Sequence, residues 1–273
     1  MSLEILNKYK IKAKKSLWQN FLVNDDIVEE IADAINVERE NIVEVWPGYW
    51  ALTEKLIARK PKSLNLVELD KDMIDILEKR IINNDFDLNW IDFQINNVDV
   101  LKYDIGDIDG GYSIIANIPY YITSPILRHF LYDVKTKPEN MVILMQKDVW
   151  DKILGKGKNK SSVLSLFVDK KSSVWELIVV WKQNFVPAPK VESSVLVFEL
   201  HDDYKDIDDN KFLELIKKWF KEPRKMLMKN LVTSGYEKSH ITDIFWELHI
   251  DISIRWEDLD ISTWCELCKK IHK

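Results

Sequence analysis

Short apolar runs of strand length alternate with helix-like segments through the first half of the chain. The segments between the runs repeat apolar residues at helical spacing, as at 71–82 and 124–132. Alternation of this kind predicts a mainly parallel sheet with helices on both faces. The five runs lie at 42–45, 64–69, 91–95, 113–116 and 141–145.

The pattern changes in the second half. Two further strands are predicted at 176–180 and 194–200, and they would complete the sheet with an antiparallel pair. The acidic run HDDYKDIDDN that follows is typical of a linker, and every later segment is helical in pattern. We therefore predict an α/β domain over residues 1–201 and a small all-helical domain over residues 202–273.

Composition limits the class of protein. With 273 residues and 46% hydrophobic content, the chain can bury a large core. No run of 18 apolar residues and no apolar signal segment is present, so we expect no membrane insertion and a cytoplasmic location. Cys265 and Cys268 give no disulfide framework, and with His272 they are too few for a structural zinc site, so we expect no metal.

The charge pattern bears on nucleic-acid binding. A net charge of −6 argues against indiscriminate binding, although local basic clusters can override the total. Basic residues gather around 8–15, 152–171 and 224–229. A solvated surface and a contact with RNA both explain each cluster.

Two acidic residues follow predicted strands. Glu68 ends the second strand, at the position where nucleotide-binding folds use an acidic side chain to hold ribose hydroxyls. Asp99 follows the third strand, at the edge of the sheet where open α/β folds bind ligands. A surface carboxylate at a strand end gives the same pattern, so spacing alone leaves both interpretations open.

The fourth predicted strand ends in Asn117-Ile118-Pro119-Tyr120. An amide oxygen and a backbone carbonyl placed in this way can accept both hydrogens of an exocyclic amine and turn its lone pair toward a methyl donor. Pro119 stiffens the backbone, and Tyr120 offers a face on which a flipped base can stack. A simple turn that closes the strand also explains these four residues.

Several segments in a fixed order carry a resemblance to a known family. They are LWQNFL at 17–22, VEVWPGYWALTE at 43–54, VELD at 67–70, NIPYYITSPIL at 117–127, LMQKDV at 144–149 and FVPAPKVESSV at 185–195. Together they resemble ribosomal RNA adenine N(6),N(6)-dimethyltransferases. The resemblance covers the whole chain, because RKMLMKNL at 224–231 and IRWEDLDISTW at 254–264 are similar to that family's helical C-terminal domain.

The resemblance implies a Rossmann-like domain that uses S-adenosylmethionine. Glu68 would hold the ribose hydroxyls, Asp99 the adenine amino group, and Asn20 with the turn backbone the methionine portion. The cofactor-binding positions that the resemblance implies are Asn20, Leu22, Trp46, Gly48, Glu68, Asp99 and Asn117.

The resemblance also implies the catalytic positions and the reaction. Asn117 and the carbonyls of Ile118 and Pro119 would orient the target amine, with Tyr120 and Phe185 stacked on the adenine. Methyl transfer would be a direct in-line displacement, in which alignment and stacking carry the rate.

As a whole, the resemblance implies a monomeric enzyme that dimethylates two adjacent adenosines near the 3′ end of small-subunit rRNA during ribosome biogenesis. Its partner would be that rRNA or the small subunit in assembly. Two alternatives stay open. Resistance methylases of large-subunit rRNA share most of these motifs, and a non-catalytic assembly factor would bind rRNA without the cofactor.

The chain departs from the family at the turn after the first strand, where Trp46 and Trp50 stand in place of glycines. Trp18, Trp219 and Trp256 also stand where similar sequences commonly carry glycine. Average usage of about 7% glycine predicts roughly 19 in this length, whereas the chain has 7 glycines and 11 tryptophans. A residue forced into glycine's backbone conformation costs on the order of 1–3 kcal/mol, and an indole could fill cofactor volume. The sequence as written therefore predicts a damaged cofactor site.

Two explanations of these tryptophans stay open. In the first, a reassigned codon that means glycine was translated as tryptophan; glycine at the ten positions other than Trp264 would bring the glycine content close to the average. In the second, the protein has diverged, keeping rRNA binding and losing methyl transfer. We favour the first, because drift does not replace many glycines with one residue type.

Overall fold

The computed structural model describes residues 2–106, 108–155, 162–219 and 225–272. The chain divides into two compact units, the first comprising Met1–Trp150 and Val174–Leu200. The second comprises Asp151–Ser173 and His201–Lys273. This division differs from the predicted one in the segment 151–173, which joins the C-terminal helices. The assignment of domains stays a prediction.

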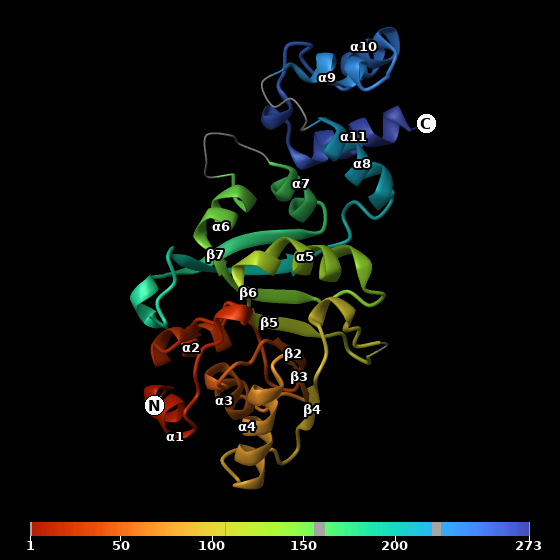
Figure 1. Cartoon of the computed structure of the whole chain (residues 1–273). Coiled ribbons are helices and arrows are strands. Elements are labelled where there is room, and N and C mark those ends of the chain that lie inside the picture. The colour runs from red at the N-terminus through yellow and green to blue at the C-terminus, as the bar shows by residue number, and fades with distance from the viewer. Residues whose placement is uncertain (1, 107, 156–161, 220–224, 273) are drawn as a thin grey trace. The chain divides into compact units, whose positions relative to one another are not determined.

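A seven-stranded sheet runs through the first unit (Figure 1). Its order is β4-β3-β2-β5-β6-β9-β7, with β2 to β6 parallel to one another and β9 antiparallel to β6. The predicted α/β class is confirmed. The strands are β1 (Phe21–Leu22), β2 (Asn41–Val45), β3 (Ser63–Val67), β4 (Asp92–Asn96), β5 (Ser113–Asn117), β6 (Asn140–Gln146), β7 (Ser172–Val180), β8 (Phe185–Val186) and β9 (Ser193–Leu200).

The strand order reverses beside β2. The chain steps outward from β2 to β3 and β4, and then returns to place β5 on the other side of β2. In open α/β sheets such a reversal leaves a crevice outside the carboxyl ends of the two central strands. The α-helices are α1 (Ser2–Lys8), α2 (Asp25–Ala32), α3 (Ala51–Ala58), α4 (Lys71–Ile82), α5 (Thr123–Arg128), α6 (Lys147–Ile153), α7 (Val163–Asp169), α8 (Asp209–Trp219), α9 (Leu227–Thr233), α10 (Lys238–Glu247) and α11 (Ile261–Ile271).

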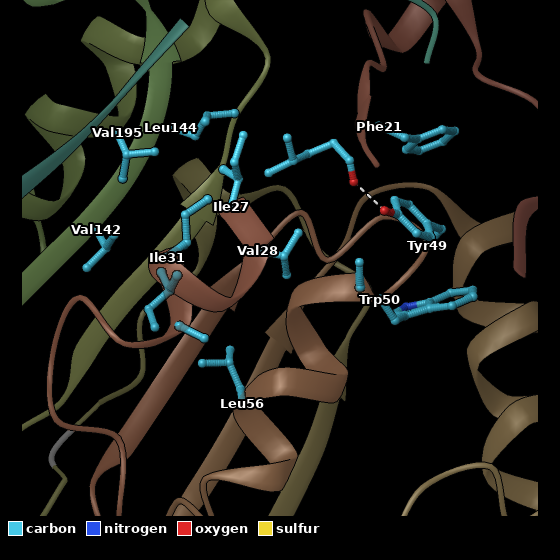
Figure 2. Packing of buried hydrophobic residues seen from close by; sticks show 14 of the residues in the cluster. Phe21, Ile27, Val28, Ile31, Tyr49, Trp50, Leu56, Val142, Leu144 and Val195 are labelled. Carbon is cyan, nitrogen blue, oxygen red and sulfur yellow. Dashed lines mark hydrogen bonds between the residues drawn. The ribbon is translucent and has the colours of Figure 1, made fainter. Parts of the chain in front are cut away.

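Helices α2, α3 and α4 bury their apolar sides in one cluster with a face of the sheet. In α2, Ile27 and Ile31 recur at helical spacing, and the Asn24 side chain caps the helix by accepting from two backbone N–H groups of its first turn. Alternate residues of β6, Val142 and Leu144, face this cluster, as the two-residue period of a strand requires. Figure 2 shows these side chains between α2, α3 and the strands.

The second unit is helical and contains a buried cation. The Lys170 side chain is fully buried, and its Nζ donates to the backbone oxygen of Ile207 at 3.0 Å and to the Asp209 carboxylate. Such pairing is what a buried ammonium requires. Cys265 and Cys268 are free and buried in α11.

Some features were not predicted from the sequence. Short strands β1 and β8 pair antiparallel, with Leu22 opposite Phe185. The predicted helix at 124–132 is α5 followed by a π-helical turn at His129–Asp133. Among the described residues, no helix combines the length and the apolar character needed to cross a membrane.

Candidate active site

A cavity lies at the carboxyl ends of β2 and β5, where the strand order reverses. The space inside it, including the part open to solvent, is about 920 Å³. Its lining includes residues 17–22, the turn at 46–49, residues 116–119, and the side chains of Glu44, Glu68 and Phe185. All of these belong to the first unit.

The turn between β2 and α3 adopts left-handed backbone at every second residue. The φ angles are 55° at Trp46, 56° at Gly48 and 70° at Trp50. Glycine takes this conformation freely, whereas an L-residue with a Cβ pays roughly 1–2 kcal/mol. The backbone therefore has the form of a three-glycine turn, with tryptophan at two of the three positions.

The two indoles of this turn lie in different surroundings. Trp46 lines the cavity. Trp50 is not part of the lining; it is fully buried in the core (Figure 2). The Arg80 guanidinium carbon lies 5.7 Å from the centre of its ring. The Nε1 of Trp50 has no hydrogen-bond partner among the described residues. The expectation that an indole takes up cofactor volume therefore applies to Trp46, while Trp50 strains the backbone and leaves a buried N–H unpaired.

Two tryptophans outside this turn also have left-handed backbone. Trp18 has a φ of 53° and is 66% exposed, and Trp90 has a φ of 73° and is fully exposed. Trp256, by contrast, lies in a 3-10 turn at Trp256–Asp258 and is buried. The Trp219 side chain lies outside the described residues. Left-handed backbone at four tryptophans is consistent with positions suited to glycine.

Glu68 follows β3 and faces the turn. One carboxylate oxygen accepts the Asp70 backbone N–H at 2.7 Å, and the other accepts the Gly48 backbone N–H at 3.4 Å. Burial raises the pKa of Glu68 to about 7, against the opposing effect of these two hydrogen bonds. The side chain is only 3% exposed and lines the cavity, so a bound ligand can be its remaining partner.

A second buried carboxyl lines the same cavity and was missed by the sequence analysis. Glu44 is 1% exposed, and neither of its carboxylate oxygens makes a hydrogen bond of ordinary geometry within the described structure. Burial raises its pKa to about 8; the nearby Thr53 hydroxyl opposes this and the Glu68 charge adds to it. An acidic residue among the apolar residues of the fully buried strand NIVEV was the signal that could have identified it.

Replacing Glu44 by glutamine should make stability less sensitive to pH. In the folded protein the pKa of Glu44 is about 8, above its ordinary value of 4.5, so the folded state keeps a proton that the unfolded chain releases. Stability from this source is therefore lost as the pH rises toward 8. We expect the melting temperature of the parent to fall more steeply than that of Glu44→Gln between about pH 5 and pH 9. Equal slopes would contradict the assignment, and the exposed Glu38→Gln is the matched control.

The corner after β5 brings the predicted substrate-binding residues to the cavity. Asn117, Ile118 and Pro119 all contribute to the lining, and Phe185 reaches it from β8. The β1–β8 pairing places Phe185 opposite Leu22. The structure thus gathers three segments that are far apart in the sequence around one cavity.

The other predicted site residues fall into three groups. Asn20, Leu22, Trp46 and Gly48 line the cavity with those already described. Asp99 does not; its carboxylate accepts the Leu101 backbone N–H at 3.1 Å and caps a short 3-10 turn. The Tyr120 side chain lies outside the described residues. The roles of all these residues stay predictions. Within the described ranges, no group of three or more His, Cys, Asp or Glu side chains could hold a metal ion.

Comparison with known proteins identifies sequence relatives along nearly the whole chain. Residues 10–273 match the model of a family described as "Ribosomal RNA adenine dimethylase". "Ribosomal RNA small subunit methyltransferase A" of Mycoplasma mobile is 34% identical over 255 residues, which cover 92% of this chain and 95% of the relative. The protein of the same name from Desulfitobacterium hafniense is 35% identical over 269 residues, covering 96% and 93%.

Solved structures share the fold. A dimethyladenosine transferase from Plasmodium falciparum matches with a TM-score of 0.77 and 21% identity, covering 90% of this chain and 95% of that one. The 23S rRNA methyltransferase ErmE matches with a TM-score of 0.71 and 16% identity, covering 93% and 100%. At these identities the likeness concerns the fold alone.

Proposed function

The chain belongs to the ribosomal RNA adenine dimethylase family, and on that premise we propose that it dimethylates the exocyclic amines of two adjacent adenosines near the 3′ end of small-subunit rRNA. The methyl donor is S-adenosylmethionine. The relatives named as small-subunit methyltransferases match nearly the full chain, which supports the small subunit in assembly as the partner.

The residues of the cavity suit this cofactor. S-adenosylmethionine carries a net positive charge, and two buried carboxyls, Glu44 and Glu68, line the cavity. The Glu44 oxygens make no hydrogen bond of ordinary geometry in the described protein, so a bound ligand can satisfy them. When bound, the cofactor supplies a methyl group on a positively charged sulfur, which is a good leaving group. We assign the ribose hydroxyls to Glu68 and the methionine portion to Asn20 with the backbone of the turn at 46–49.

The corner at 117–119 orients the substrate. We assign the amide oxygen of Asn117 and a carbonyl of Ile118 or Pro119 as acceptors for the two hydrogens of the adenine amine. With both hydrogens held, the nitrogen lone pair points out of the plane of the base toward the methyl group, and the proton of the methylated amine is released to water. Rate acceleration then comes from alignment, which can contribute several kcal/mol. Phe185, with Tyr120, provides the stacking surface for the flipped base.

The observation that carries this proposal is the single cavity that joins the two acids to the corner at 117–119. The test is incubation of small subunits that lack the modification with the protein and isotopically labelled methyl donor. Mass spectrometry of rRNA fragments should find dimethyladenosine at two adjacent positions near the 3′ end. Label on large-subunit rRNA alone would favour the resistance-type activity. Binding of rRNA with no cofactor binding would favour an assembly factor.

Replacing Phe185 by leucine should weaken substrate use more than cofactor binding. Loss of a stacking surface costs about 1–3 kcal/mol per base, so kcat/KM for the subunit should fall about 5- to 100-fold. Leucine keeps the site apolar, and the dissociation constant of the cofactor should change by less than about twofold. Phe198→Leu, in β9 and outside the cavity lining, controls for loss of core packing. An equal loss in both variants would contradict the stacking role.

We also propose that the enzyme acts in the cytoplasm as a monomer and that its C-terminal helices contact rRNA. The exposed Lys229 of α9 supports the last point as a candidate phosphate contact. Arg224 of the same basic cluster lies outside the described residues.

A further inference from the structure

A buried carboxylate sits behind the cofactor cavity. Asp70 is 4% exposed, follows Glu68 by two residues, and is not part of the cavity lining. Its side chain accepts from the Lys14 ammonium at 2.6 Å, the Gln19 side-chain amide at 2.9 Å and the Asp72 backbone N–H at 3.1 Å. The last bond caps α4, while the first two come from a segment more than 50 residues away.

These bonds connect two walls of the cavity. The Asp70 backbone N–H donates to Glu68 at 2.7 Å, and Glu68 lines one wall. Gln19 lines the other wall, and its side-chain oxygen accepts the Lys14 backbone N–H at 2.8 Å. Asp70 is therefore the common partner of both walls. If its contacts are broken, the segment at 17–22 loses the Gln19 hydrogen bond that ties it to the β3–α4 turn.

The charge of Lys14 is already balanced within the protein. Besides Asp70, its Nζ contacts the Asp72 carboxylate at 2.6 Å, and the pKa of Lys14 is raised chiefly by the hydrogen bond to Asp70. Its side chain is 37% exposed. A lysine held between two carboxylates attracts an RNA phosphate less than a free surface lysine does. The neighbouring Lys12 is exposed and has no such contact within the described structure.

We propose that Lys14, Gln19 and Asp70 are positioning residues of the cofactor site, which hold the segment at 17–22 against the turn that presents Glu68. The proposal rests on the proposed function, because it takes S-adenosylmethionine as the ligand of the cavity. The proposal gives Lys14 a different role from the rest of the basic cluster at 8–15. For that cluster, the sequence pattern alone is explained equally by RNA contact and by a solvated surface.

Calorimetric titration of S-adenosylmethionine into the full-length protein, without RNA, tests this role. Lys14→Gln and Asp70→Asn should each raise the dissociation constant about tenfold, the loss expected for one charged hydrogen bond. Asparagine is itself a good helix cap, so α4 keeps its first turn in Asp70→Asn. Lys14→Arg, which keeps the charge, should bind nearly as well as the parent. Lys12→Gln should bind as the parent does.

Kinetics distinguish positioning from a general loss of structure. For Lys14→Gln we expect KM for the cofactor to rise about tenfold and kcat at saturating cofactor to stay within about twofold. The double variant Lys14→Gln with Asp70→Asn should lose much less than the product of the two single effects, because both remove the same contact.

Other outcomes overturn the inference. If Lys14→Gln binds the cofactor normally and instead lowers the salt dependence of rRNA binding by about one charge, Lys14 is an RNA contact. Equal losses in Lys12→Gln and Lys14→Gln would also exclude the positioning role. If the parent protein itself binds no S-adenosylmethionine, the proposed function fails and this inference fails with it. If the parent and the Lys14 and Asp70 variants all bind S-adenosylmethionine equally well, only this inference fails.

Discussion

Replacement of Asn117 by alanine is expected to slow methyl transfer about 100-fold or more at saturating substrate and cofactor. The reason is geometric. Asn117 ends β5 and lines the cavity, and its amide oxygen is the side-chain acceptor that we assign to the adenine amine. Without it, one N–H of the amine is unpaired and its lone pair is no longer fixed in direction. Single-turnover methylation of small subunits with labelled cofactor measures the effect.

A matched variant separates the acceptor role from other losses. Asn117→Asp keeps an oxygen that can accept the amine hydrogen, so it should retain more of the rate than Asn117→Ala. Both variants should melt close to the parent, because Asn117 is only partly buried. Methylation by Asn117→Ala at the parental rate would contradict the proposed role of the corner at 117–119.

Replacement of Trp46 by glycine is expected to tighten cofactor binding about tenfold or more and to stabilise the protein. Trp46 has a φ of 55° and its side chain lines the cavity. Glycine relieves roughly 1–2 kcal/mol of backbone strain and removes the indole from the ligand's volume. Titration of S-adenosylmethionine and thermal denaturation of the two proteins measure the two effects.

Two further variants isolate the backbone from the side chain. Trp46→Ala also clears the indole but keeps a Cβ at left-handed backbone, so it should be less stable than Trp46→Gly by roughly 1–2 kcal/mol. Gly48→Ala makes the reverse change at a φ of 56°, where an added Cβ would meet Phe21 at an ordinary 3.5 Å. Its cost should therefore be strain alone. Unimpaired cofactor binding by the parent, with no gain in Trp46→Gly, would show that the turn tolerates the indole.

Trp50 decides between the two origins of the tryptophans. Its indole is fully buried, and truncating a core tryptophan costs about 3–5 kcal/mol when the core is packed around it. A glycine at its φ of 70° relieves strain instead. Net stabilisation of Trp50→Gly would indicate a core built for glycine, as a reassigned codon requires. Ordinary tryptophan codons at positions 46 and 50 would exclude that explanation.

The sheet and the position of the cavity followed from local pattern. Short apolar runs between helical segments predict parallel strands, and the runs at 42–45 and 113–116 correspond to β2 and β5, whose carboxyl ends carry the cavity. Local signals suffice here, because each strand and helix buries a face that its own sequence shows. The resemblance to the family is confirmed by the match over residues 10–273. It was the resemblance that predicted which residues surround the cavity.

Other features depend on contacts that no local pattern contains. A two-residue strand such as β1 exists only because Phe21 and Leu22 meet β8 across most of the first unit. The partners of Asp70 are equally distant, and a Val-Glu-Leu-Asp segment gives no sign of Lys14. Glu44 was not predicted as a site residue, because its apolar neighbours in β2 identify the segment as a buried strand and do not indicate a ligand site. The residue roles at the cavity stay predictions for the experiments above.

The pairing of β1 with β8 has a consequence during synthesis. Residues 17–22 and Phe185 line the same cavity, and β1 pairs with β8. Residues 17–22 are synthesised early in translation, whereas Phe185 is synthesised much later. A nascent chain that has not yet released residue 186 therefore lacks one part of the candidate active site. If Phe185 has the stacking role that we propose, premature termination anywhere in the first two thirds of the message yields fragments unable to methylate rRNA, whatever their remaining affinity for the cofactor.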